Sequence, residues 1–306
     1  MAKARAIVKR RRAVRNIRKI TQTMQLIATA RFQKTLQRAT ASQPYTRGIT
    51  GMIATLGGQQ AVDHPLLKPN GNHERSLVLV ITSNRGLAGA YNASVLRRML
   101  EFRRELEAGG LTPAMEVVGK KGLNFLRFLR VPVALAITDV EDKIAFARVA
   151  EMAERYMDLF RRKAIARVDV VYMQFHSVAV QRPVAAQLLP MTGESTDAPA
   201  GAAARAAGRA ASPPRRPGAR ESWFEFSPAP DVLLAHLIPE AVKIRLYQFF
   251  NEAIVSEQVA RMTAMKAATD AAGDMLKYLT RQYNRARQTQ ITTELADIVG
   301  GANAVQ

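Results

Sequence analysis

The clearest hydrophobic pattern of the chain lies in its last seventy residues. Between Asp231 and Asp297 the only residues that disfavour a helix are Pro239 and Gly273. Apolar and small side chains recur there in alternating steps of three and four, the heptad spacing of a helix that winds on another helix. These seam positions are Met262, Met265, Thr269, Ala272, Leu276, Leu279, Tyr283 and Ala286. At 1.5 Å per residue the helix would span roughly 90–100 Å, which exceeds the width of a compact domain.

A second pattern of this kind occupies the N-terminal part of the chain, where residues 3–57 read as one long helical tract. Its apolar stripe consists of Val14, Ile17, Thr21, Met24 and Ala28, with Ile20 and Ile27 widening it on one side. Pro44 should kink or interrupt the helix, and Gly57 and Gly58 are expected to end it. We predict that the two terminal helices pair along their seams as a long antiparallel, left-handed coiled coil.

The middle of the chain alternates strand-like and helix-like segments. Strands are expected at 76–82, 115–119, 131–138, 168–175 and 182–190, and helices at 92–108, 122–129 and 144–163. Such alternation predicts a mostly parallel sheet covered by helices, and the last two strands, joined by a short turn, should form an antiparallel pair. The predicted fold class is therefore α/β, with a Rossmann-like domain inserted between two long helices.

These patterns divide the chain into successive parts. The parts are an N-terminal shaft helix (1–57), a linker (58–75), an α/β domain (76–192), an Ala/Pro/Arg-rich loop (193–224) and a C-terminal shaft helix (231–306). Within the loop, residues 193–220 contain too few large apolar side chains to fold alone, so we expect a disordered surface segment.

Composition adds a strong positive charge to this picture. The chain has a formal net charge of +20, and no Asp or Glu precedes Asp63. Such a surface favours an acidic partner, which could be nucleic acid, anionic lipid or an acidic protein face. The basic N-terminus has no apolar signal core, and a mitochondrial transit peptide is disfavoured because the tract continues directly into the first helix. The chain has no run of eighteen apolar residues, so no membrane-spanning segment is predicted.

Candidate chemistry is sparse. The chain has no cysteine, and its four histidines are far apart, so no metal site and no cofactor are predicted. The segment SNRGLAGAYN (83–92) follows a strand and precedes a helix, as phosphate-binding loops do, but it lacks a dinucleotide or P-loop motif. Asp139, Glu141 and Asp142 precede the helix at 144–163 and are read as its N-terminal caps. No catalytic residues are predicted.

The distal end of the C-terminal helix carries a run of positive charge. Lys277, Arg281, Arg285 and Arg287 lie beside the neutral hydrogen-bonding residues Gln288, Gln290 and Thr292. A solvated helix face usually mixes charge signs through pairs four residues apart. We therefore expect this face to meet an external acidic surface.

Three segments together resemble the gamma subunit of rotary ATP synthases. They are VRNIRKITQTMQLIATARFQK near the N-terminus, TSNRGLAGAYN in the middle, and SEQVARMTAMKAATDAAGDMLKYLTRQYNRARQTQITTELADIVGGANAV at the C-terminal end. The resemblance implies a non-catalytic central shaft inside a ring of three alpha and three beta subunits, with the α/β domain on the proteolipid c-ring and the epsilon subunit. It implies a peripheral location on the cytoplasmic face of a bacterial cell membrane, rather than in a mitochondrial matrix.

The same resemblance suggests which residues contact the beta subunits. Met24 matches the family's neck residue beside acidic lever loops, and Arg18, Lys19 and Arg31 are expected partners of those loops. Arg287 and Gln288 match residues that hydrogen-bond a catch loop of beta, and Thr292 and Glu294 follow about one turn later. The chain departs from the family's GLCGG-like turn, which reads GLAGA here, and without cysteine it cannot be regulated by thiol chemistry.

The residues themselves leave two other functions open. A basic helical nucleic-acid-binding protein would explain the charge, although no recognition module is evident. A nucleotide-dependent enzyme would use the SNRGLAGAYN turn.

Overall fold

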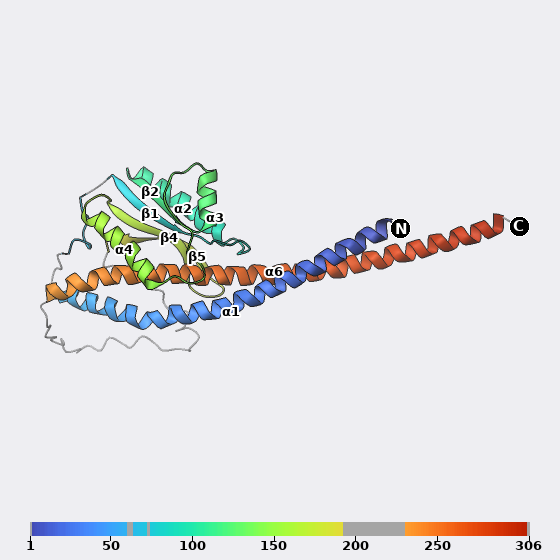
Figure 1. Cartoon of the computed structure of the whole chain (residues 1–306), viewed down its shortest axis with the longest axis horizontal. Coiled ribbons are helices and arrows are strands. Elements are labelled where there is room, and N and C mark those ends of the chain that lie inside the picture. Colours follow the sequence, from blue (N-terminus) through green and yellow to red (C-terminus); the bar gives the residue numbers. More distant parts are fainter. Residues whose placement is uncertain (1, 60–63, 72–73, 192–229, 305–306) are drawn as a thin grey trace, which may run out of the picture. The chain divides into compact units, whose positions relative to one another are not determined.

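The structure, a computed structural model, describes residues 2–59, 64–71, 74–191 and 230–304 (Figure 1). Two very long helices, α1 (Ala2–Gln59) and α6 (Pro230–Ala304), flank the other elements in the sequence. The strands are β1 (Arg75–Ile81), β2 (Thr112–Val118), β3 (Val133–Ile137), β4 (Arg167–Phe175) and β5 (Gln181–Leu189), and the shorter helices are α2 (Tyr91–Ala108), α3 (Lys120–Phe128) and α4 (Phe146–Arg161). The predicted fold class is confirmed.

The strands form one sheet in the order β3-β2-β1-β4-β5. The first four strands pair in parallel, and β4 pairs with β5 in antiparallel fashion, as predicted. Because β2 and β4 lie on opposite sides of β1, the chain changes direction across the sheet between β1 and β4. In open α/β sheets, this change of direction is where ligands bind.

Alternating side chains of the strands build two apolar layers. Leu77, Leu79 and Ile81 belong to one buried cluster, while Val78 and Val80 belong to the other, as the period of two in a strand requires. The first cluster includes side chains of α4 and of the 230–260 part of α6, and the second includes those of α2 and α3. The sheet is therefore the middle layer between two layers of helices (Figure 1).

The chain forms two compact units whose boundaries fall inside the long helices. One unit contains residues 1–30 and 261–306, and the other contains residues 31–260. This division follows packing, whereas the sequence-based boundaries follow element type. The predicted disordered loop at 193–224 lies outside the described residues.

Helix α1 is longer and less broken than predicted. It passes through Pro44 without interruption and includes Gly57 and Gly58. Proline removes one backbone hydrogen bond, here the one to the carbonyl of Thr40, and the helix continues because Pro44 itself lies at an exposed position. Glycine in a helix costs only about 1 kcal/mol, so two glycines near an end do not terminate it by themselves.

The prediction that the acidic cluster caps a helix is wrong. Helix α4 begins at Phe146, its N-cap residue is Ala145, and no side chain makes a capping hydrogen bond. The three acidic residues precede the first turn by too many positions to reach its amide groups. Instead they form ion pairs: Asp139 with Arg148 at 3.8 Å, Glu141 with Arg85 at 3.6 Å, and Asp142 with Arg31.

Candidate functional site

All but one of the residues expected to contact a partner lie in the unit formed by 1–30 and 261–306. Within this unit the two helical segments pair in antiparallel fashion. The hydroxyl of Thr269 donates to that of Thr21 at 2.8 Å, and the guanidinium of Arg11 lies 5.0 Å from the ring centroid of Tyr283. Residues earlier in α1 therefore contact residues later in α6, as two antiparallel helices require.

On α6 the expected seam positions face inward. Met265, Ala272 and Leu279 are buried, and the seam positions between and beyond them, Met262, Thr269, Leu276 and Tyr283, are half-buried. A spacing of three and four residues therefore describes the face of α6 that packs on α1.

On α1 the buried stripe is offset from the expected one. Thr21 and Ala28 are buried and Val14 is half-buried, but Ile17 is 52% exposed and does not lie in the seam. The other half-buried positions of this segment are Ile7 and the polar residues Arg11, Gln25 and Thr29. Small side chains at Thr21, Ala28 and Ala272 let the helices approach closely at these positions.

The offset leaves a row of large apolar side chains on the outside of α1. Ile17, Ile20, Met24 and Ile27 follow one another in steps of three, four and three, so they share one face of the helix. Their exposed fractions are 52%, 59%, 36% and 46%. An apolar row at heptad spacing on an exposed helix face is the feature by which one helix docks against another surface. We call these four residues the outer apolar row.

The distal part of α6 exposes cationic and amide groups. Arg281, Arg285, Arg287 and Gln288 are exposed, and no ion pair engages the three arginines among the described residues. Lys277, by contrast, pairs with Asp274 at 3.1 Å. The guanidinium of arginine forms two parallel hydrogen bonds with a carboxylate, so this surface is suited to an acidic loop.

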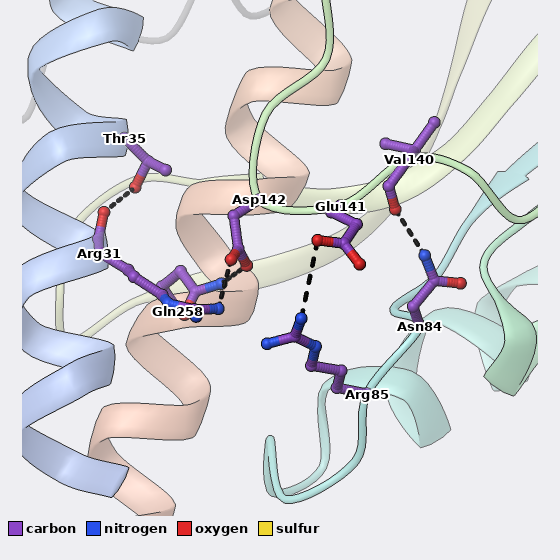
Figure 2. A network of polar contacts seen from close by, with 8 residues as sticks. All are labelled: Arg31, Thr35, Asn84, Arg85, Val140, Glu141, Asp142 and Gln258. Carbon is purple, nitrogen blue, oxygen red and sulfur yellow. Dashed lines mark hydrogen bonds and ion pairs between the residues drawn. The ribbon is translucent and has the colours of Figure 1, made fainter. Parts of the chain in front are cut away.

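The other expected contact residues differ in how available they are. Thr292 is exposed and its hydroxyl donates to the carbonyl of Gln288 at 3.0 Å, while Glu294 accepts from Gln290 at 2.8 Å. Lys19 is exposed. The Arg18 guanidinium packs near Gly273, about 3.8 Å from the position that a Cβ atom would occupy there. Arg31 belongs to the other unit, where its guanidinium is already bound to Asp142 (Figure 2).

The crevice where an open α/β sheet would hold a nucleotide is filled. A cavity at the carboxyl ends of β1 and β2 has a volume of about 20 Å³ and is lined partly by Phe250, Ala253 and Ile254 of α6. That volume holds about one water molecule, whereas ligand pockets measure roughly 300–1,000 Å³. The turn at 83–92 is explained by its backbone, since Leu87 and Gly89 have φ angles of +63° and +55°.

Two buried carboxylates of residues 31–260, Glu116 and Asp169, are paired with arginines within the fold. Glu116 accepts from the hydroxyl of Tyr156 at 2.8 Å and from Arg155, and burial raises the pKa of Tyr156 well above its ordinary value. Asp169 accepts two hydrogen bonds from Arg167, and burial raises its pKa. Such satisfied pairs fix packing in the core. Among the described residues, no cluster of His, Asp or Glu side chains is arranged to hold a metal ion.

One cluster of polar contacts between elements was not predicted from the sequence. Asp142, which the sequence analysis treated as a helix cap, contacts both long helices, because it accepts hydrogen bonds from Arg31 of α1 and from Gln258 of α6. The sequence offered a signal for it in the acidic residues after β3, but no local pattern indicates a contact more than one hundred residues away.

Comparison with known proteins gives consistent results over the whole chain. A family model described as ATP synthase matches residues 3–305. The "ATP synthase gamma chain" of Rhodopirellula baltica is 40% identical over 309 residues, and that of Leptospira biflexa is 32% identical over 306 residues; in both cases the match covers 100% of each protein.

Solved structures share the fold. A chain from the mitochondrial ATP synthase of Euglena gracilis, in a structure of its OSCP, F1 and c-ring, superposes with a TM-score of 0.67 at 19% identity. The match covers 99% of this chain and 95% of that one. A chain of the rotor of the same enzyme gives a TM-score of 0.62 at 18% identity, covering 95% and 99%. Within the described residues, no helix is long and apolar enough to cross a membrane.

Proposed function

Because this chain belongs to the ATP synthase gamma-chain family, we propose that it is the central rotor shaft of a proton-translocating ATP synthase. The observation that carries the proposal is a full-length family match together with an antiparallel helix pair that exposes an apolar row and unpaired arginines. In this role the chain transmits rotation and performs no catalytic step itself. The nucleic-acid-binding and nucleotide-dependent alternatives find no support among the relatives.

The partners follow from the role. We place residues 1–30 and 261–306 inside a ring of three alpha and three beta subunits, and we place the α/β domain against the epsilon subunit and the proteolipid c-ring. The complex would hold the chain at the cytoplasmic face of a bacterial cell membrane as a peripheral subunit. A membrane-embedded ring then turns the shaft, and the shaft acts on catalytic sites that lie in other subunits.

Rotation drives catalysis only if the shaft presents different surfaces to the three beta subunits. A contact shifts a conformational equilibrium by no more than its difference in affinity for the two conformations. The helix pair meets this requirement because its exposed faces are unlike. The outer apolar row lies on α1, whereas Arg281, Arg285 and Arg287 lie on α6. Each orientation therefore favours one beta conformation over the others.

Two groups of residues are assigned to beta contacts in this proposal. Met24, with the rest of the outer apolar row, meets the lever loops of beta together with Arg18 and Lys19. Arg287 and Gln288 hydrogen-bond the catch loop, with Thr292 and Glu294 about one turn beyond them. The exposure of Met24, Arg287 and Gln288 supports these assignments. Arg31 is left out because Asp142 already binds its guanidinium.

Substitution of Arg287 and Gln288 by alanine in the assembled enzyme tests the catch contact. Hydrogen bonds to charged groups contribute about 1.5–3 kcal/mol, so we expect coupled ATP synthesis to fall about tenfold or more. The matched control is Lys266→Ala, which removes a cation from an exposed position of α6 outside the distal basic surface and should leave the rate near wild type.

Native mass spectrometry of the purified complex supplies the assembly measurement. We expect one copy of this chain with three alpha and three beta subunits, for the wild type and for both variants. Wild-type synthesis rates in a fully assembled double variant would remove the catch assignment. Absence of alpha and beta subunits from the wild-type preparation would remove the proposed function itself.

A further inference from the structure

Asp142 joins three parts of the 31–260 unit through one carboxylate. Its Oδ2 accepts a hydrogen bond from Nη1 of Arg31 on α1, and its Oδ1 accepts one from Nε2 of Gln258 on α6 at 2.9 Å (Figure 2). Asp142 itself lies in the loop between β3 and α4. Both oxygens are therefore used, each by a different long helix.

The loop that carries Asp142 is fixed to the sheet. The amide of Asn84, just after β1, donates to the carbonyls of Thr138 at 3.0 Å and Val140 at 2.6 Å. Its Oδ1 accepts from the backbone amide of Lys120 at the start of α3 at 3.0 Å. These bonds hold the loop at the carboxyl ends of the strands, so Asp142 is a rigid attachment point (Figure 2).

The two helices are also anchored next to the Asp142 contact. On α1, the ring of Phe32 packs against that of Phe175, with centroids 6.4 Å apart. On α6, the hydroxyl of the fully buried Ser256 donates to the carbonyl of Met173 at 3.1 Å. Both anchors use the end of β4. The polar contacts of Asp142 therefore complete a junction that apolar and backbone contacts have already oriented.

The position of this junction along the helices is its most informative property. Arg31 is the first residue of α1 in the 31–260 unit, and Gln258 lies within one turn of the point where α6 leaves that unit. Covalent continuity of the two helices is the path by which a torque on one unit enters the other. Each helix is thus bound to the α/β domain at the last turn before that path begins.

The chemistry of the three groups makes Asp142 hard to replace. Gln258 is fully buried, so loss of its acceptor leaves a desolvated amide without that partner. The Arg31–Asp142 pair is about one-third exposed and would contribute little as an isolated surface pair. In this junction, however, the same carboxylate accepts from both Arg31 and Gln258. An asparagine at position 142 could accept from one of these two donors but would present its own NH₂ group to the other.

We propose that Asp142 is a positioning residue that locks α1 and α6 to the α/β domain at this junction, so that the domain and both helices turn as one body. The role rests on the proposed rotor function, since locking matters only if torque crosses the junction. The contact takes no part in any reaction and touches no catalytic residue. It determines how much of a rotation of the domain reaches the helices.

The main test uses Asp142→Asn in the assembled enzyme in membrane vesicles. We expect ATP hydrolysis to persist, because the catalytic sites lie in other subunits, while the number of protons pumped per ATP falls. The matched control is Glu141→Gln, which removes the neighbouring carboxylate, whose ion-pair partner Arg85 follows β1 and belongs to neither long helix. The exchanged pair Arg31→Asp with Asp142→Arg should recover part of the lost coupling, which a general packing defect would not allow.

A second measurement keeps the inference testable if Asp142→Asn fails to assemble. In the isolated full-length chain, amide hydrogen exchange near Gln258 should become about tenfold faster in Asp142→Asn, since loss of a charged hydrogen bond lowers the local opening free energy. Glu141→Gln should leave it unchanged. Unchanged exchange in Asp142→Asn, or unchanged pumping per ATP in its assembled complex, would overturn the inference. A wild-type complex that lacks the alpha and beta subunits would instead refute the rotor function on which it rests.

Discussion

The two compact units bury their apolar side chains in opposite ways. Residues 31–260 contain both large core clusters, built on the two faces of the sheet. No described residue of 1–30 or 261–306 belongs to either cluster, and the buried residues of that unit are Thr21, Ala28, Arg261, Met265, Ala272 and Leu279. The α/β unit buries most of its large apolar side chains within itself, whereas the helix pair leaves a row of them exposed.

The charges of the two units support the same contrast. Residues 1–30 carry nine Lys and Arg and no acidic residue, and residues 261–306 carry six Lys and Arg against four Asp and Glu. In the 31–260 unit several arginines form ion pairs with carboxylates, as Arg155 does with Glu116 and Arg167 with Asp169. An excess of positive charge beside exposed apolar groups suits the helix pair to an acidic, partly apolar partner surface.

The largest difference should come from exchanging one large apolar side chain in each unit for alanine. Phe250 is fully buried against the sheet, so Phe250→Ala should lower the free energy of unfolding by about 3–5 kcal/mol. Ile17→Ala in the isolated chain should change it by less than about 0.5 kcal/mol, because the side chain is half exposed and contacts no core. Denaturant unfolding of the isolated chain measures both. A comparable loss in the two variants would show that the outer apolar row is covered within the chain itself.

A second, smaller effect is a dependence of stability on pH, which should come from a buried carboxyl group of the α/β unit. Glu252 of α6 is buried, and desolvation raises its pKa to about 7 against the opposing hydrogen bonds from Gln248, Tyr172 and the backbone of Phe175. A carboxyl whose pKa is raised in the folded state stabilises the fold below its unfolded pKa of about 4.5, and this contribution is lost as the pH rises through 7. Between pH 5 and pH 8.5 the loss should be about 2 kcal/mol.

The variant Glu252→Gln isolates this contribution. It cannot ionise, so relative to the wild type it should gain about 2 kcal/mol of stability between pH 5 and pH 8.5. Denaturant unfolding at the two pH values measures the difference. Glu151→Gln, at an exposed position of α4, is the control for the loss of a surface carboxylate. An equal stability difference at both pH values would mean that Glu252 is already charged at pH 5 in the fold.

The contrast between the units also explains what could be predicted from the sequence. The strands were predictable because a run such as SLVLVIT is apolar on both faces and bounded by polar turns. The helix pair was predictable as a pair, but not in its register, because Ile17 and Val14 fit the heptad rhythm equally well. Close packing selects the smaller residues Thr21 and Ala28, and this selection depends on the partner helix. The Asp142 junction depends on contacts over more than one hundred residues, which no local pattern contains.

The smallest predicted effect measures how far the helix pair stabilises itself. The hydroxyls of Thr21 and Thr269 share a hydrogen bond at 2.8 Å across the seam, between otherwise small or half-buried side chains. In a double-mutant cycle with Thr21→Val and Thr269→Val, the coupling energy should be about 0.5–1 kcal/mol, as for a neutral hydrogen bond. Hydrogen exchange of the flanking amides in the isolated chain measures it locally, and Thr23→Val, whose exposed hydroxyl donates to the carbonyl of Lys19, is the control. A coupling well above 1 kcal/mol would make the seam a strong interface in its own right. A coupling in the expected range would make this hydrogen bond a minor contribution beside the packing of the buried seam residues Met265, Ala272 and Leu279.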